Sequence, residues 1–129
     1  MNLQEFFEQI DLHDSGIDNF QYFSLQQKLI LTIEFCHYLQ NNYQSNDPET
    51  TINKLMFSGV KSLTSNPDIN QVKWGEKMNG QILDVIVSKL DNSLDSQIKI
   101  LLDVTDYIKN IDITFSLVFV ASDVSWLTN

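Results

Sequence analysis

Arginine is missing from this sequence. All eight cationic residues are lysine, and 17 aspartate and glutamate residues bring the formal net charge to −9 at pH 7. Arginine makes the usual bidentate contacts with phosphate and guanine, and basic patches draw proteins to nucleic acids and anionic lipids. The composition therefore argues against binding to nucleic acid or to a membrane. It favours a basic protein as the partner.

Cysteine is almost absent as well. Cys36 is the only one, so the chain forms no internal disulfide and nothing indicates an oxidising compartment. The first residues lack the basic start and apolar run of a signal peptide. Every apolar run is far shorter than the ~20 residues that cross a bilayer. We therefore expect a cytoplasmic protein.

The acidic residues are concentrated towards the two ends of the chain. Residues 1–27 carry a net charge of −5 and residues 91–129 one of −4, whereas residues 28–90 contain equal numbers of acids and lysines. If both ends lie on one side of the fold, the protein has an acidic face. General solubility is the alternative explanation of this charge.

The pattern of apolar residues predicts one domain, spanning residues 1–129, with a mainly β or α+β fold. Helical spacing predicts a short helix within Asn2–Leu12, with Asn2 as its N-cap and Glu5 in the capping-box position. Alternation predicts about six strands in an antiparallel sheet or sandwich, at Ile17–Ser24, Lys28–His37, Lys54–Leu63, Gln81–Leu90, Gln97–Val104 and Asp112–Ser122. Gly59 inside the third strand predicts a bulge or a close backbone approach.

One short motif resembles catalytic machinery. His13, Asp14 and Ser15 follow one another just before the first predicted strand. Triad members normally come from separate parts of a fold, and three consecutive side chains do not align as nucleophile, base and orienting group. We therefore expect this motif to form a turn or a partner contact. A small enzyme that uses His13, Asp14 and His37 remains an alternative.

Metal and cofactor sites have little support in the sequence. Cys36 and His37 are neighbours on a predicted strand and so point to opposite faces. The paired spacing of zinc ligands is absent. The segment Asp91–Asp95 resembles a calcium loop only loosely, since the glycine and the closing glutamate are missing. The four glycines form neither a dinucleotide-binding motif nor a P-loop. We expect no metal and no cofactor.

A protein-binding surface is better supported. Large aromatic residues, which often anchor interfaces, occur at strand ends and in connections, although such residues also plug the ends of sheets. Acidic side chains would orient a basic partner. The residues expected to contact the partner are Glu5, Glu8, Asp14, Asp18, Tyr43, Trp74, Asp103, Asp106, Asp123 and Trp126.

Residues 12–63 contain the segments LHDSGIDNF, KLILTIEF and LMFSGVKSL. This arrangement resembles small bacterial β-rich domains in which a His-Asp-Ser turn leads into a meander of strands. Some of those domains are immunity proteins against polymorphic or contact-dependent inhibition toxins. The resemblance implies a non-enzymatic protein that binds a cognate toxin domain and blocks its active site. A DNA-mimic inhibitor, with carboxylates spaced like phosphates, is a further alternative.

Overall fold

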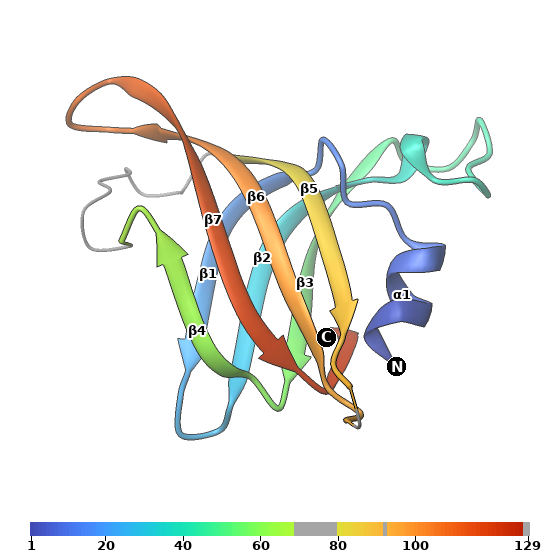
Figure 1. Ribbon diagram of the computed structural model, residues 1–129. Helices are drawn as coiled ribbons and strands as arrows, with labels where there is room; N and C mark the ends of the chain where they lie inside the picture. The colour runs from blue at the N-terminus through green and yellow to red at the C-terminus, as the bar shows by residue number, and fades with distance from the viewer. Residues whose placement is uncertain (69–79, 92, 128–129) are drawn as a thin grey trace.

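The computed structural model describes residues 1–68, 80–91 and 93–127 (Figure 1). Within these residues, one helix and one 3-10 turn accompany eight strands, which all pair antiparallel in a single sheet of order β4-β7-β6-β5-β1-β2-β3-β8. The elements are α1 (Leu3–Gln9), β1 (Gly16–Phe23), β2 (Lys28–Cys36), η1 (His37–Leu39), β3 (Thr50–Ser58), β4 (Lys61–Asn66), β5 (Gly80–Lys89), β6 (Ser96–Asp106), β7 (Ile111–Ala121) and β8 (Asp123–Leu127).

The predicted antiparallel β fold with a short N-terminal helix is confirmed, but the predicted number of strands is wrong. The described part of the chain has eight strands rather than about six. The predicted strand Lys54–Leu63 divides at Gly59 into β3 and β4, and the chain after Ser122 forms the unpredicted β8. Gly59 has a φ of +66°, and a Cβ there would lie 2.2 Å from the Ser122 Oγ. The expected close approach at Gly59 is therefore present, and it forms a corner.

The sheet bends sharply at this corner. Ser58 pairs with Asp123 on one side of it, and Lys61 pairs with Val120 on the other. The two edge strands, β4 and β8, are thus short continuations of the interior strands β3 and β7. Figure 1 shows the resulting strong curvature, with α1 beside the lower half of the sheet.

The core lies on the concave side of the sheet. Leu29, Leu31 and Ile33 of β2 are fully buried there, as the alternation of that strand predicts. One face of β7 is also buried, from Phe115 to Ala121. The opposite face of β7 is only half-buried because the convex side of the sheet meets solvent.

Helix α1 closes one side of this core. Leu3 and Phe6 are buried, and the Asn2 side chain accepts a hydrogen bond from the Glu5 backbone N–H at 3.2 Å. Asn2 is therefore the N-cap, as predicted. None of the helices in the described part of the chain has the length and apolar character needed to cross a bilayer.

Candidate functional site: an acidic end of the sheet and an adjoining pocket

Four carboxylates gather at one end of the sheet, where β1, β5 and β7 begin and β2 and β6 end. We call this group the acidic end, and it consists of Asp14, Glu34, Asp103 and Asp112. Glu34 lies between two buried residues of β2, and Asp103 does the same in β6. Because side chains alternate along a strand, both carboxylates point to the outer, convex face.

Strand pairing sets these residues in register across the sheet. Gly16 of β1 pairs with Glu34 on one side and with Gln81 of β5 on the other, and Gln81 in turn pairs with Asp103. The Gln81 side-chain amide donates a hydrogen bond to Asp14 at 3.0 Å. Residues from the first and last parts of the chain therefore meet here. The condition for an acidic face, that both ends of the chain lie on one side of the fold, is met here by Asp14 and Asp103.

Asp112 extends this group onto β7. Its carboxylate accepts a hydrogen bond from the Thr105 hydroxyl at 2.8 Å, which fixes its orientation. It lies diagonally from Asp103, which pairs with Thr114, two residues further along β7. Diagonal neighbours on paired strands are about 7–8 Å apart. The two negative charges therefore repel each other through solvent.

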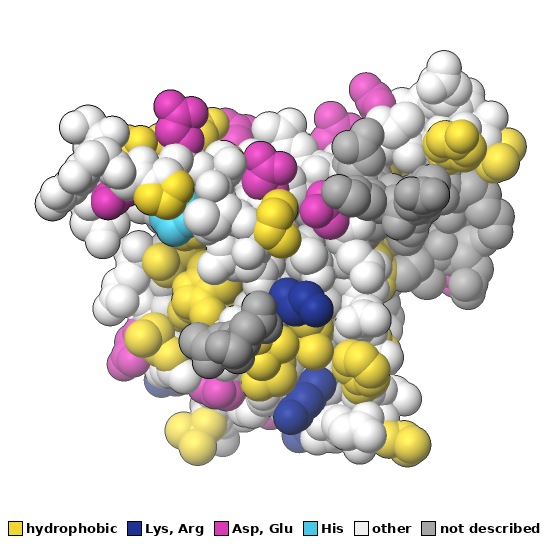
Figure 2. Space-filling view, turned by 180° about the vertical axis from the view of Figure 1, so that it is seen from behind, with side chains coloured by type: hydrophobic (Ala, Val, Ile, Leu, Met, Phe, Trp, Pro, Cys, Tyr) yellow, Lys and Arg dark blue, Asp and Glu magenta, His cyan; other side chains and the backbone are white. Residues whose placement is uncertain are grey.

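None of the carboxylates of the acidic end forms an ion pair with a lysine in the described structure. Its only ion pair there joins Asp14 to His13, at 3.4 Å between Oδ2 and Nδ1. Figure 2, which shows the opposite side from Figure 1, shows several acidic side chains along the upper part of the molecule, whereas its lysines lie lower down together with further acidic side chains.

Several residues expected to contact the partner lie elsewhere. Glu5 and Glu8 are exposed on α1. Asp18 is half-buried in β1, at a shift in its register with β2. Asp123 lies at the opposite end of the sheet and pairs with the N-terminal ammonium. Only Asp14 and Asp103 of the predicted acids belong to the acidic end.

The prediction that Asp106 contacts the partner needs correction, because this residue is not a surface charge. The residue is only 3% exposed, and its carboxylate accepts hydrogen bonds from the backbone N–H groups of Ile108 and Lys109, each at 3.0 Å. These bonds close the turn between β6 and β7. Asp106 therefore has a structural role, and a partner cannot reach its carboxylate.

The aromatic residues expected to anchor a partner also have local roles. Trp126 is half-buried and packs against Phe6 and Phe35, with ring centroids 5.7 and 5.2 Å apart. It closes the core beneath α1, as the alternative reading of these aromatics expected. The Tyr43 hydroxyl donates to a backbone carbonyl in its own loop at 3.1 Å. Trp74 lies outside the described residues.

Sequence reasoning missed Glu34 and Asp112 as members of the site. The signal for Glu34 was present, since it stands at an outward position in a strand whose inward positions are all apolar. Asp112 sits at the start of a predicted strand, but only the pairing of β6 with β7 brings it beside Asp103. That pairing could not be derived from spacing along the chain.

The His-Asp-Ser motif forms a turn, as expected. Asp14 has a φ of 66°, and the Ser15 side chain turns inward, is fully buried and accepts a hydrogen bond from the Cys36 backbone N–H at 3.2 Å. The Ser15 hydroxyl is thus held away from solvent. His37 is engaged separately, with its Nε2 2.6 Å from the Thr51 hydroxyl. No group of three metal-ligating side chains occurs within residues 1–68, 80–91 and 93–127.

Tyr38 lies next to this turn and is about half exposed. A hydrogen bond with the Cys36 side chain raises the pKa of the Tyr38 phenol above its ordinary value, and electrostatic interactions with Cys36, Asp14 and Glu49 act in the same direction. This effect links Tyr38 electrostatically to the acidic end.

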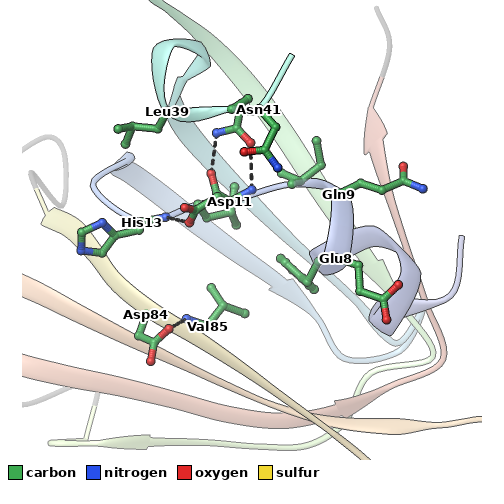
Figure 3. Close-up of a pocket in the computed structure, with 12 residues that line it drawn as sticks. Glu8, Gln9, Asp11, His13, Leu39, Asn41, Asp84 and Val85 are labelled. Carbon is green, nitrogen blue, oxygen red and sulfur yellow. Dashed lines mark hydrogen bonds between the residues drawn. The ribbon is translucent and has the colours of Figure 1, made fainter. Parts of the chain in front are cut away.

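A pocket of about 290 Å³ opens beside the acidic end (Figure 3). It lies between α1, the segment that follows it, the chain after η1, and β5. The Gln40 side chain joins two of its walls, because it accepts from the Asp11 N–H at 2.8 Å and donates to the Asp11 carbonyl at 2.7 Å. The residues that line it are Phe7, Glu8, Gln9, Ile10, Asp11, Leu12, His13, Leu39, Gln40, Asn41, Asp84 and Val85.

Comparison of the chain with protein-family models, with curated proteins and with solved structures found no match. The functional argument therefore depends on the residues and geometry described above.

Proposed function

We propose that this protein is a non-enzymatic, cytoplasmic binding protein, an immunity or inhibitor protein that neutralises a basic bacterial toxin by direct contact. The observation that carries the proposal is the acidic end, where strand pairing assembles four carboxylates, none of which forms an ion pair with a described lysine. A positively charged protein surface would supply the missing countercharges. Complementary charge of this kind speeds and orients association.

The arrangement supports binding more than catalysis. The Ser15 hydroxyl is buried and bonded to backbone, so it is not available as a nucleophile. His13 lines the pocket, whereas His37 contacts Thr51 and the ring of Phe35. The alternative enzyme needs His13, Asp14 and His37 to converge, and the described contacts of the two histidines are separate.

Co-expression with a basic toxin encoded beside this gene tests the proposal. We expect wild-type protein to restore growth and to elute with the toxin as one complex on gel filtration. The double variant Glu34→Gln/Asp103→Asn should lose protection, because it removes two charges of the acidic end while leaving side-chain size almost unchanged.

The matched control is Glu5→Gln/Asp91→Asn, which changes the net charge equally at two exposed positions away from the acidic end. It should protect as wild type does. Continued killing by the toxin in the presence of wild-type protein, with no complex on gel filtration, would overturn the proposal. If DNA displaced this protein from the toxin, the DNA-mimic alternative would be identified instead. That alternative predicts that DNA and this protein bind the same site on the toxin.

A further inference from the structure

The turn between β6 and β7 carries three exposed apolar side chains. Tyr107 and Ile108 are 70% and 73% exposed, and Ile111 at the start of β7 is 51% exposed. Asp106 pairs with Ile111, so residues 107–110 form the whole connection and the three side chains belong to one turn. Single apolar residues are common on protein surfaces, whereas a group of them in one place is typical of contact sites. We call Tyr107, Ile108 and Ile111 the apolar tip.

The hairpin of β6 and β7 carries the apolar tip away from the rest of the sheet. The two strands pair from Ser96 with Ala121 to Asp106 with Ile111, so they form a continuous stem. Figure 1 shows the turn projecting at the upper left, beyond the ends of the neighbouring strands. This turn rises from the acidic end, where β6 ends and β7 begins. The apolar tip therefore reaches a partner that approaches the acidic end.

Hydrogen bonds within the turn fix its conformation. The buried Asp106 carboxylate accepts from the N–H groups of Ile108 and Lys109, each at 3.0 Å, and the Asp106 carbonyl accepts from the Asn110 N–H at 2.8 Å. Asn110 has a φ of 54°, in the left-handed region where asparagine is enriched. A side chain that an ordered turn presents loses less entropy on binding. The turn thus presents its apolar side chains in one arrangement before a partner arrives.

Carboxylates flank the apolar tip on the outer face of the hairpin. Asp103 and Asp112 belong to the acidic end, and neither forms an ion pair with a described residue. Residues 103–112 contain three acids and one lysine, a net charge of −2. A surface that covers the tip also meets these charges, so a basic surface is complementary to it. The same charges repel an anionic lipid surface and the tip of a second copy.

We propose that the apolar tip docks into an apolar recess on a basic protein, with Asp103 and Asp112 facing lysine or arginine side chains at the rim of that recess. The tip supplies the buried contact, and the acidic end orients the approach. Tyrosine is among the residues that most often carry the binding energy of an interface. The identification of the basic protein as a toxin rests on the proposed function, whereas the docking of the tip on a basic protein does not.

Isothermal titration with the toxin encoded beside this gene tests the docking. Tyr107→Ser/Ile108→Ser removes the two most exposed side chains of the tip and should weaken the complex by at least about tenfold. The matched control is Leu25→Ser/Leu94→Ser, which removes two almost fully exposed apolar side chains from the turns at the opposite end of the strands. It should change the affinity less than about twofold. Both variants should keep the wild-type urea midpoint, because all four side chains are exposed.

Two kinds of result would overturn the assignment of the tip. The first is wild-type affinity in Tyr107→Ser/Ile108→Ser, and the proposed function would then stand if the complex still depends on Glu34 and Asp103. The second is self-association in ultracentrifugation, or binding to phosphatidylcholine vesicles, that the same variant abolishes. A second copy or a lipid surface would then be the occupant of the tip.

Photocrosslinking tests the tip separately if the wild-type protein forms no complex with the toxin. Ile108→p-benzoylphenylalanine, in the cells that naturally contain the protein, should capture a basic protein. Its purified form should bind wild type and bind Tyr107→Ser/Ile108→Ser at least about tenfold more weakly. That outcome supports the tip and removes the proposed function. Capture no greater than that of Leu94→p-benzoylphenylalanine, or capture of an acidic protein, would overturn the tip.

Discussion

The acidic residues at the two ends of the curved sheet differ in whether they form ion pairs. At the end with the corner, Asp95 lies 3.7 Å from the Lys61 ammonium, and Asp123 contacts the N-terminal ammonium of Met1. We call these four residues the paired end. At the acidic end, Glu34 and Asp103 form no ion pair with a described residue. The ion pairs of the paired end stabilise the fold, whereas repulsion between the carboxylates of the acidic end destabilises it.

This difference explains why the charges counted along the chain do not show which carboxylates lie together in the fold. Asp103 and Asp123 belong to the same acidic segment, yet they lie at opposite ends of the sheet. Uncompensated like charges destabilise the compact state through mutual repulsion. Their presence at one end therefore needs an explanation other than stability, and binding to a basic surface supplies one.

The largest expected effect concerns the backbone beneath the acidic end. A Cβ at Gly80 would lie 2.7 Å from a Val104 methyl and 2.9 Å from an Ile17 methyl, both in the core. Gly80→Ala should therefore lower the free energy of unfolding by about 2 kcal/mol, as overpacked cores do. Urea denaturation measures this change.

Gly16→Ala is the control, since a Cβ at this neighbouring position makes only ordinary contacts, at 3.5 Å or more. It should cost less than about 1 kcal/mol relative to wild type. Equal losses in the two variants would show that the close packing of β5 at Gly80 does not determine the stability of the acidic end.

We expect a smaller loss of stability from a substitution at the corner of the paired end. Gly59→Ala should lower the free energy of unfolding by about 1 kcal/mol or slightly more, because alanine is strained at a φ of +66° and its Cβ meets the Ser122 side chain. Adding Ser122→Gly removes the closest contact and should restore part of the loss. No restoration would mean that backbone strain alone accounts for the effect.

The charges themselves should give small effects of opposite sign at the two ends. Glu34→Gln/Asp103→Asn should raise the free energy of unfolding by about 0.5 kcal/mol at low salt, because it relieves repulsion. Asp95→Asn should lower it by about 0.5 kcal/mol, because it removes the partner of Lys61. Both differences should shrink in 0.5 M salt. Urea curves at two salt concentrations measure them, and a stability loss in the double variant would contradict the account.

The smallest effect is the titration of Tyr38. Its raised pKa predicts that the phenol ionises above the ordinary value of about 10. The folded protein therefore holds this proton more tightly than the unfolded chain, and the associated stability is lost as the pH rises from 10 through the higher folded value. Absorbance titration of wild type against Tyr38→Phe isolates the group. Cys36→Ala should return it towards 10, and an unchanged titration would exclude the Cys36 contact as the cause.

Much of the fold could be predicted from local patterns. The alternation in Lys28–Cys36 and the N-cap at Asn2 depend on neighbours in sequence, and both match the structure. The corner at Gly59 was recognisable only as a close approach. Its effect on the number of strands depends on Ser122, 63 residues away, so no local pattern revealed β8.

The candidate site was less predictable because strand order assembles it. Gln81 lies between Asp14 and Asp103 only because β5 pairs with both β1 and β6. Asp106 has the same residue type and almost the same sequence position as Asp103, but it points inward and caps a turn. Sequence supplied the kind of charge, and the pairing of strands decided which carboxylates share a surface.

Isothermal titration with the purified basic partner, at low and at raised salt, tests the central claim most directly. The account predicts that Glu34→Gln/Asp103→Asn weakens binding at low salt by at least about tenfold, while the charge-matched Glu5→Gln/Asp91→Asn changes it less than about twofold. Raised salt should reduce the gap. Equal weakening by the two double variants would contradict the account, because it would mean that net charge matters and the acidic end does not.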